Sequence, residues 1–450
     1  MFRRLLIANR GEIAVRIIRA CRQMGITSIA VYSDADADSM HVALADESIC
    51  IGPASPTESY LHIPGIIAAA EICDTQAIHP GYGFLSENAK FAQICEDHHI
   101  GFIGPSPDAI AMSGDKSVCR DIVKAVGVPV VPGSDGLIHD AEEAREVANE
   151  IGFPVLVKAS AGGGGKGMRI AHNDVALLSA FSVATAEAEA NFGDGSMYLE
   201  KYIENARHIE VQILADQHGK VISLGERECS IQRRHQKLIE ETPSIAITPS
   251  VRSKMMKAAI KIAKAVKYSN AGTVEFLYDD DTSNFYFIEF NARIQVEHPV
   301  TEEVIQKDLV VEQIRIASGE PLGYNSLKPR GHSIEARINA EDPARDFQPT
   351  PGTLNQLYLP GGPGIRVDTH IRAGYTVPMY YDSLLAKIVA WGETRDQAIE
   401  RLAGACDEFR VQGIETTAGL CAKILRSGRF RRGDISVNFV EQFMQNKLNT

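Results

Sequence analysis

Residues 157–171, VKASAGGGGKGMRIA, combine a glycine run with lysines and could enclose a phosphate group. A Walker-type loop needs Ser or Thr directly after its Gly-Lys, whereas Gly167 follows Lys166 here. The spacing of Gly162, Gly164 and Gly167 fits a dinucleotide fingerprint, but the strand-like Met-Arg-Ile-Ala follows where that fingerprint requires a helix. Because strand-like FPVLVKA precedes the glycines, we predict two antiparallel strands joined by a glycine-rich flap that closes over a nucleotide triphosphate, with a plain surface hairpin as the alternative.

Paired carboxylates occur in a second stretch, AGTVEFLYDDDTSNFYFIEFNARIQVEHPVTEE. A hairpin turning near residue 282 places Glu275 roughly opposite Glu289, and the two-residue period of a strand puts Asn291 on the face of Glu289. Opposed carboxylates repel unless a hard cation lies between them, and this ligand set suits magnesium carried by phosphates. The alternative is that one glutamate is solvated or paired with Arg293.

Arg293, Gln295 and Glu297 alternate in phase with Asn291, so they line the same cleft if the extended chain continues. A cation, an amide and a carboxylate there could bind a small anion and remove a proton from it. The alternative is that Glu297 is an ordinary exposed acid.

A basic run, CSIQRRHQKLIEE, contains Arg233, Arg234, His235 and Lys237. Such a run is usually a solvated face. In this acidic protein it could instead supply the positive lining that an anionic substrate needs.

The first hundred residues alternate strand and helix patterns, which predicts an open parallel sheet. The expected strands are RLLIAN, SIAVYS, ESICIG, TQAIHP and IGFIG, with helices over 11–24 and about 62–72. The pattern breaks around Pro105, Pro107 and Gly114, and a helix near 115–126 leads into a linker. We therefore expect an N-terminal α/β domain over 1–113 and a helical linker over 114–133.

The remainder predicts two further units. Residues 134–202 hold a helix, the glycine hairpin, an alanine-rich helix near 174–191 and the strand MYLEKYI, a small lid-like α+β unit. From 203 to 450 we expect a larger, mainly antiparallel sheet with helices at 249–267 and 301–318 and a closing helix near 395–409.

Composition excludes several function classes. The 450 residues are 44% hydrophobic with a net charge of −12, so no general attraction to nucleic acid or anionic lipid is expected. No apolar run would span a membrane or form a signal peptide, and eight scattered cysteines without a C-x-x-C pair suit a reducing cytoplasm. Zinc and serine-hydrolase motifs are absent from the sequence, and LLIANRGEIA has one glycine where a redox cofactor fold needs three.

Taken together, the motifs resemble those of biotin carboxylase, the ATP-grasp enzyme of biotin-dependent carboxylases. The likeness covers essentially the whole chain and is carried by IANRGEIAVRIIRAC, IHPGYGFLSEN, GGGGKGMRI, LEKYIEN, GERECSIQRRHQK, FIEFNARIQVEHPVTEE, EARINAEDP and GYTVPMYYDS. It implies an ATP-grasp fold with an N-terminal parallel α/β domain, a small mobile lid and a larger antiparallel C-terminal domain.

The resemblance also implies a two-step reaction. ATP, with Mg²⁺ or Mn²⁺, phosphorylates bicarbonate to carboxyphosphate, and the carboxyl group passes to the ureido nitrogen of biotin on a carrier protein. No Ala-Met-Lys-Met sequence that would accept biotin is present, so the biotin comes on a separate biotin carboxyl carrier protein. Carboxyltransferase subunits and a homodimer are the further partners implied.

Carried onto matching positions, the family's roles fall on the following residues. ATP would be bound by Lys116, Lys158, Gly162, Gly163, Gly164, Gly165, Lys166, Gly167, Glu200, Lys201, Ile203, His208, Gln232, His235 and Leu277. Magnesium would be held by Glu275, Glu289 and Asn291. Bicarbonate would be fixed by Lys237, Arg293, Gln295 and Val296, with Glu297 as general base. Arg337 would stabilise the biotin enolate oxygen, with Tyr82 near the bicyclic ring.

Several functional interpretations stay open at this point. Acetyl-CoA carboxylase, which feeds malonyl-CoA to fatty acid synthesis, is the preferred assembly, and a two-subunit pyruvate carboxylase or another acyl-CoA carboxylase is the alternative. Another ATP-grasp ligase would join a different acceptor to an acyl phosphate. A regulatory nucleotide-binding protein or a scaffold would bind ATP or partners without turnover.

Overall fold

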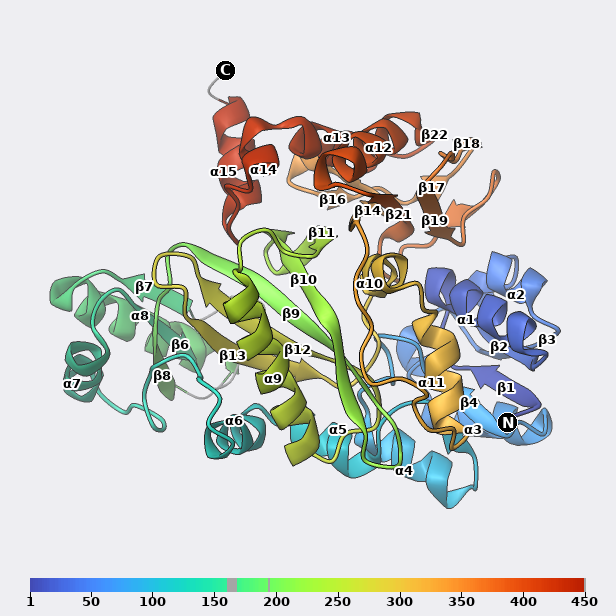
Figure 1. Cartoon of the computed structure of the whole chain (residues 1–450), viewed down its shortest axis with the longest axis horizontal. Coiled ribbons are helices and arrows are strands. Elements are labelled where there is room, and N and C mark those ends of the chain that lie inside the picture. Colours follow the sequence, from blue (N-terminus) through green and yellow to red (C-terminus); the bar gives the residue numbers. More distant parts are fainter. Residues whose placement is uncertain (160–167, 193–194, 449–450) are drawn as a thin grey trace.

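The computed structural model describes residues 1–159, 168–192 and 195–448, and within them two large sheets and one small sheet organise the chain. In Figure 1 the teal helices α7 and α8 and the blue N-terminal sheet lie at opposite ends of the molecule, with the long green and yellow strands between them. The glycine run and Lys166, at residues 162–167, lie outside the described residues.

The N-terminal unit is the predicted open parallel sheet, in the order β3-β2-β1-β4-β5. Its core forms because Leu5, Leu6 and Ile7 of the central strand are fully buried between helices on both faces. The elements are β1 Arg4–Ile7, α1 Gly11–Met24, β2 Thr27–Ser33, α2 Met40–Leu44, β3 Glu47–Gly52, α3 Ile63–Ile72, β4 Ala77–His79, α4 Ala89–Asp97 and β5 Gly101–Phe102.

The strand–helix alternation ends after β5, as predicted around Pro105, but the sequence pattern did not predict the helix that follows. Helix α5, Pro107–Gly114, occupies this segment, and α6, Lys116–Ala125, follows almost at once. Proline favours the first helical position, where its missing N–H costs no hydrogen bond, and the Ser106 side chain caps the helix by accepting from the Ala109 amide. Pro107 therefore starts a helix here.

The lid-like unit contains the three-stranded sheet β7-β6-β8 under two helices. Strands β6, Val155–Ala159, and β7, Met168–Ala171, pair antiparallel with Lys158 opposite Met168, which confirms the strands predicted on either side of the glycine run. The remaining elements are α7 Ala141–Ile151, α8 Asp174–Phe192 and β8 Met197–Lys201.

An eight-stranded sheet in the order β13-β12-β9-β10-β11-β14-β21-β19 joins the rest of the chain, and its neighbouring strands pair antiparallel as predicted. The basic run lies at the turn between β10 and β11, where Arg234 and His235 adopt left-handed backbone conformations. The strands are β9 Ala206–Ala215, β10 Val221–Arg233, β11 Gln236–Thr242, β12 Asn270–Asp279, β13 Phe285–Asn291, β14 His332–Asn339, β19 Ile365–Thr369 and β21 Leu384–Gly392, and α9, Pro249–Ala265, packs on β9 and β10.

Two helical predictions in this region are wrong. The helix predicted over 301–318 is two helices, α10 His298–Ile305 and α11 Leu309–Ala317, because Gln306 adopts a left-handed conformation that ends the first. The helix predicted to close the chain, α12 Arg395–Glu408, is followed by α13 Ala418–Arg426, α14 Gly428–Arg432 and α15 Phe439–Leu448, which lie in the red region of Figure 1.

Short strands complete the C-terminal unit. Three two-stranded sheets pair β15 Glu341–Asp342 with β16 Gln348–Pro349, β17 Gly352–Thr353 with β20 Thr376–Val377, and β18 Gln356–Tyr358 with β22 Arg410–Gln412. Among the described residues of the whole chain, no helix has the length and apolar character required to cross a membrane.

Candidate active site

A cavity of about 1560 Å³ brings together every predicted site residue that the structure describes. It is bounded by the lid, the parallel sheet and the carboxylate-bearing strands of the long sheet. The predicted residues that line it are Tyr82, Lys116, Lys158, Glu200, Lys201, Ile203, His208, Gln232, His235, Lys237, Glu275, Leu277, Glu289, Asn291, Arg293, Gln295, Val296, Glu297 and Arg337.

The two carboxylates expected to oppose each other do so. Glu275 of β12 and Glu289 of β13 are register partners, and Asn291 donates from Nδ2 to Glu275 Oε1 at 2.9 Å. Burial and the charge of Glu275 raise the pKa of Glu289, as expected for two close carboxyl groups with no cation between them. This electrostatic conflict is what a hard cation would relieve.

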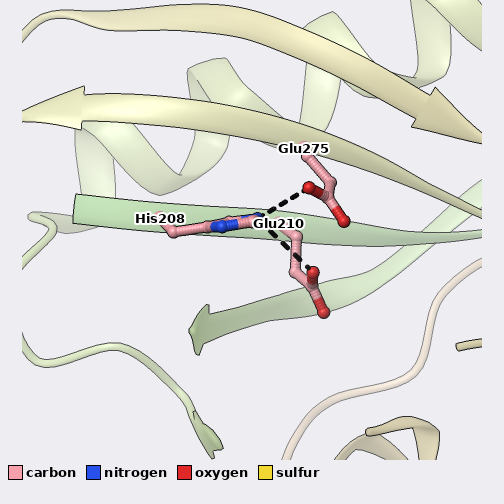
Figure 2. A group of neighbouring side chains, drawn as sticks. All are labelled: His208, Glu210 and Glu275. Carbon is pink, nitrogen blue, oxygen red and sulfur yellow. Dashed lines mark ion pairs between the residues drawn. The ribbon is translucent and has the colours of Figure 1, made fainter. Parts of the chain in front are cut away.

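Glu275 also lies against a histidine and a third glutamate. Figure 2 shows the His208 ring directed toward both Glu275 and Glu210, with its two ion pairs as dashed lines. His208 Nε2 is 2.8 Å from Glu275 Oε2 and 3.8 Å from Glu210 Oε2. Burial disfavours the imidazolium, but the charge of Glu275, its hydrogen bond to the ring and the charge of Glu210 together raise the pKa of His208.

Lys237 supplies the central cation of the cluster. Its Nζ donates to Glu210 Oε2 at 2.6 Å, to Glu275 Oε1 at 3.1 Å and to Glu297 Oε1 at 2.6 Å. Burial disfavours this ammonium, but the three carboxylates together raise its pKa well above the usual value. Because all three ammonium protons are taken by carboxylates, a bound anion would have to displace at least one of them.

Glu297 is held between two cations. Its Oε1 accepts from Lys237, and its Oε2 accepts from Arg337 at 2.9 Å. Burial opposes ionisation, yet Lys237 and Arg337 hold the pKa of Glu297 well below its usual value. The side chain is therefore an ionised carboxylate facing the cavity, in the form a general base requires.

Strand β13 ends at Asn291, so the alternation predicted to continue through Arg293, Gln295 and Glu297 does not. The chain bends at Ala292 and Arg293 and turns at Val296 and Glu297, the cap residue of α10. All three side chains still line the cavity. Hydrogen bonds, not strand periodicity, orient them.

One of these orienting groups is Glu87, for which the sequence pattern predicts no role. Its carboxylate accepts from Arg293 Nε at 2.9 Å and from the Ala292 amide at 3.0 Å, while Arg293 Nη2 donates to Asn291 Oδ1 at 3.1 Å. Glu87 lies within GYGFLSEN, a segment that carries part of the family likeness. Nothing in the local pattern places it beside a residue 206 positions away.

A buried arginine beneath the cluster was also missed. Arg227 of β10 is fully buried and donates to Glu210, to Gln212 at 2.7 Å and to Gln295 at 2.8 Å. A signal for part of this network was available, because His208, Glu210 and Gln212 occupy alternate positions of one strand. A row of polar side chains on one face of a buried strand indicates a polar site on that face of the sheet.

Replacing Arg227 with Met is expected to lower the free energy of unfolding by about 3–5 kcal/mol, because several buried acceptors lose their donor at once. Urea unfolding followed by circular dichroism measures this. The matched control is Arg431→Met, which removes an ion pair with Glu400 between side chains that are 35% and 63% exposed, and it should cost about 1 kcal/mol or less. Equal losses in the two variants would contradict the prediction.

The side of the cavity next to β6 and β8 carries its own ion pairs. Glu200 accepts from Lys158 and, at 3.0 Å, from Arg120, a cavity residue not predicted from the sequence. Lys201 donates to the carbonyls of Gly152 and Phe153.

On the opposite side, Arg337 and Tyr82 line the same cavity. Arg337 Nε donates to Glu240 at 2.6 Å while its Nη2 binds Glu297. Burial raises the pKa of Glu240 to about 7 against the opposing charge of Arg337. The guanidinium is thus held by two carboxyl groups within the cavity wall.

Comparisons with known proteins agree with this geometry. Family models match along the chain: "Biotin carboxylase, N-terminal domain" over residues 1–110, "Carbamoyl-phosphate synthase L chain, ATP binding domain" over 115–325 and "Biotin carboxylase C-terminal domain" over 335–442. A biotin carboxylase from a Nostoc species is 54% identical over 443 residues, covering 98% of this chain and 99% of its own. The chain belongs to the biotin carboxylase family. It is an enzyme of this family, which carries out ATP-dependent carboxylation.

Other members show the range of the family. A pyruvate carboxylase subunit from Methanothermobacter thermautotrophicus is 48% identical, covering 98% of this chain and 90% of its own. The structure of a Campylobacter jejuni biotin carboxylase–beta-gamma-ATP complex has a TM-score of 0.92 at 48% identity, covering 98% of this chain and 99% of that one. The biotin carboxylase domain dimer of Hydrogenobacter thermophilus 2-oxoglutarate carboxylase, in complex with MgADP, ADP and bicarbonate, has a TM-score of 0.90 at 47% identity and covers 98% of each chain. The ATP-grasp fold expected from the sequence is confirmed.

Proposed function

We propose that this enzyme carboxylates biotin on a separate carrier protein, using ATP, Mg²⁺ and bicarbonate by way of carboxyphosphate. The proposal rests on one cavity that contains three features side by side. These are a pair of opposed carboxylates, a group of cationic side chains that could bind an anion, and the ionised Glu297. Phosphoryl transfer needs a site for metal-bound phosphates, and bicarbonate needs cations and a base.

The magnesium ligands in this proposal are Glu275, Glu289 and Asn291. The donor set fits, because carboxylate and amide oxygens are the ligands a hard cation prefers and Glu275 and Glu289 are register partners on adjacent strands. Mn²⁺ would suit the same oxygens. Bound there, the ion would neutralise charge on the triphosphate.

For bicarbonate, the proposed anion site consists of Lys237, Arg293, Gln295 and the backbone at Val296. An anion beside Lys237 takes hydrogen bonds that Glu297 now receives. The pKa of Glu297 then rises, because it loses part of a favourable charge contact. The carboxylate thus becomes a better base where its substrate binds.

For biotin, the guanidinium of Arg337 would bind the ureido oxygen. Removing the ureido proton leaves negative charge on that oxygen, and a fixed guanidinium stabilises it without reorganising. Tyr82 lies near the ring in this assignment. Lys116, Lys158, Glu200, Lys201, Ile203, His208, Gln232, His235 and Leu277, with the flap residues 162–167, would surround ATP.

The proposed domains are residues 1–113, the helical linker 114–133, the lid 134–202 and the C-terminal unit 203–450. As partners we propose a biotin carboxyl carrier protein, carboxyltransferase subunits and a second copy of the chain, in the cytoplasm. Acetyl-CoA carboxylase is the preferred assembly. A pyruvate carboxylase remains the second candidate, because the Methanothermobacter pyruvate carboxylase subunit is 48% identical to this chain.

The direct test is ADP release by the purified protein with MgATP, bicarbonate and free biotin. We expect release to depend on bicarbonate and to increase when biotin is added. Release that ignores biotin but responds to an amine or aminoimidazole acceptor would favour another ATP-grasp ligase. MgATP binding without any release would favour a regulatory role, and no binding would favour a scaffold.

A further inference from the structure

Lys387 is a fully buried lysine that has no part in the function proposed above. It lies on β21 directly opposite Arg337 of β14, so the two cationic side chains share one face of the sheet. Its Nζ donates to the carbonyl of Val296 at 2.9 Å and lies 3.0 Å from Glu12 Oε1. A lysine is almost never fully buried unless it is paired, so these contacts are what keep it there.

Glu12 belongs to the first turn of α1 and is itself buried. While Oε1 faces Lys387, Oε2 accepts a hydrogen bond from the Tyr82 hydroxyl at 2.6 Å. One carboxylate therefore joins the side chain proposed to face biotin with the ammonium that holds the Val296 carbonyl. The connection runs Tyr82, Glu12, Lys387, Val296.

Glu12 is the main counter-ion of Lys387. Two other acids act on Lys387. Asp368 lies 4.0 Å from Nζ, and its carboxylate is engaged by both Nε and Nη2 of Arg366, at 3.0 and 2.7 Å. Glu335 is fully buried, and burial, which disfavours its ionised form, raises its pKa well above the usual value despite the charge of Lys387. Removing the charge of Glu12 would therefore leave the buried ammonium with a poor partner.

The Val296 carbonyl matters because a peptide unit is planar. Fixing its oxygen fixes the plane between Val296 and Glu297, and with it the backbone from which the Glu297 side chain projects. Gln295, on the other side of Val296, donates to Glu275 at 2.7 Å. The lysine thus holds the middle of the turn that carries the proposed anion site and base.

We propose that Glu12 and Lys387 are positioning residues. They fix the biotin side and the bicarbonate side of the cavity relative to each other. This inference rests on the proposed function, because it needs Tyr82 at biotin and the 295–297 turn at bicarbonate. Glu12 lines the cavity, and Lys387 lies outside its lining. Their effect passes through the tyrosine hydroxyl on one side and the peptide carbonyl on the other.

The test compares Lys387→Met, Glu12→Gln and Tyr82→Phe by steady-state kinetics, with biotin, bicarbonate and MgATP varied in turn. Losing one buried charged hydrogen bond corresponds to about 10- to 100-fold. In Lys387→Met we expect kcat/KM to fall by that factor for both biotin and bicarbonate. In Tyr82→Phe it should fall for biotin alone, and the KM for MgATP should stay within about twofold in both variants.

Two further variants, Glu12→Gln and the double variant Glu12→Gln/Lys387→Met, distinguish a positioning role from a general loss of stability. The amide can still accept from Tyr82, so Glu12→Gln should preserve most of the biotin kinetics while impairing bicarbonate. The double variant has no unpaired buried charge and should melt above Lys387→Met, yet keep the bicarbonate defect. Arg252→Met, which removes an ion pair remote from the cavity, controls for lost stability.

The inference is overturned if the double variant regains normal kcat/KM for both biotin and bicarbonate. It is equally overturned if Lys387→Met lowers these two values of kcat/KM no more than Arg252→Met does. It is also overturned if Tyr82→Phe lowers kcat/KM for bicarbonate as much as Lys387→Met does. The tyrosine would then not act on biotin separately from bicarbonate. Failure of the proposed function is a different result. In that case the unmodified protein itself would show no biotin-stimulated, bicarbonate-dependent ADP release.

Discussion

Replacing Glu297 with Gln is expected to lower biotin-stimulated, bicarbonate-dependent turnover by about 10²- to 10⁴-fold, the usual contribution of a positioned base. The amide is as large as the carboxylate and can still accept from Lys237 or Arg337, so the cavity should keep its shape. It cannot take a proton from bicarbonate. Coupled ADP release measures the loss, and calorimetric titration should show that MgATP still binds.

The matched control is Glu226→Gln, the same change at a buried glutamate away from the residues that line the cavity. It should leave turnover close to that of the unmodified protein. Full activity in Glu297→Gln would show that another group accepts the proton. The assignment of the base would then be wrong even though the chain belongs to the family.

The same contacts set the pH dependence of this step. Because the pKa of Glu297 is held well below its usual value, the free carboxylate stays ionised as pH falls from about 8 to about 6. Glu297 therefore should not produce an acid limb in kcat/KM for bicarbonate over that interval. In Arg337→Met one of the two cations is missing, the pKa of Glu297 should rise, and any acid limb should move toward neutral pH.

Replacing Arg337 with Met is expected to reduce the biotin-dependent increment of ADP release by about 10²- to 10³-fold, the range found for removing one preorganised donor from a developing oxyanion. The measurement is ADP release with and without biotin in the same preparation. Arg337→Lys should recover only a small part of the loss. A single ammonium cannot hold Glu240 and Glu297 with separate donors while also facing the ureido oxygen.

Thermal melting separates this effect from a loss of structure, because removing Arg337 leaves the buried Glu240 without its cation. The raised pKa of Glu240 means that this carboxyl can take up a proton near neutral pH, which limits the penalty. If the biotin increment survives in a folded Arg337→Met variant, the oxyanion role of this arginine is excluded.

Local patterning alone predicted those features that depend on neighbours along the chain. The polar turn in DDDTSN and the two-residue period of the flanking strands were enough to oppose Glu275 and Glu289. The same kind of reasoning predicted the N-terminal parallel sheet and the strands on either side of the glycine run. The family resemblance then assigned a residue to each role. All of those residues that the structure describes line one cavity.

Other features were decided only when distant segments packed together. Glu87 meets Arg293 across 206 positions of sequence, and Lys387 meets Glu12 from the far end of the chain. Periodicity reports which face a side chain takes, but not which charge it will meet there. For this protein the sequence determined the strands, the opposed carboxylates and the family. The tertiary structure decided which cation holds each carboxylate, because buried charges are stable only with partners that the fold brings from elsewhere.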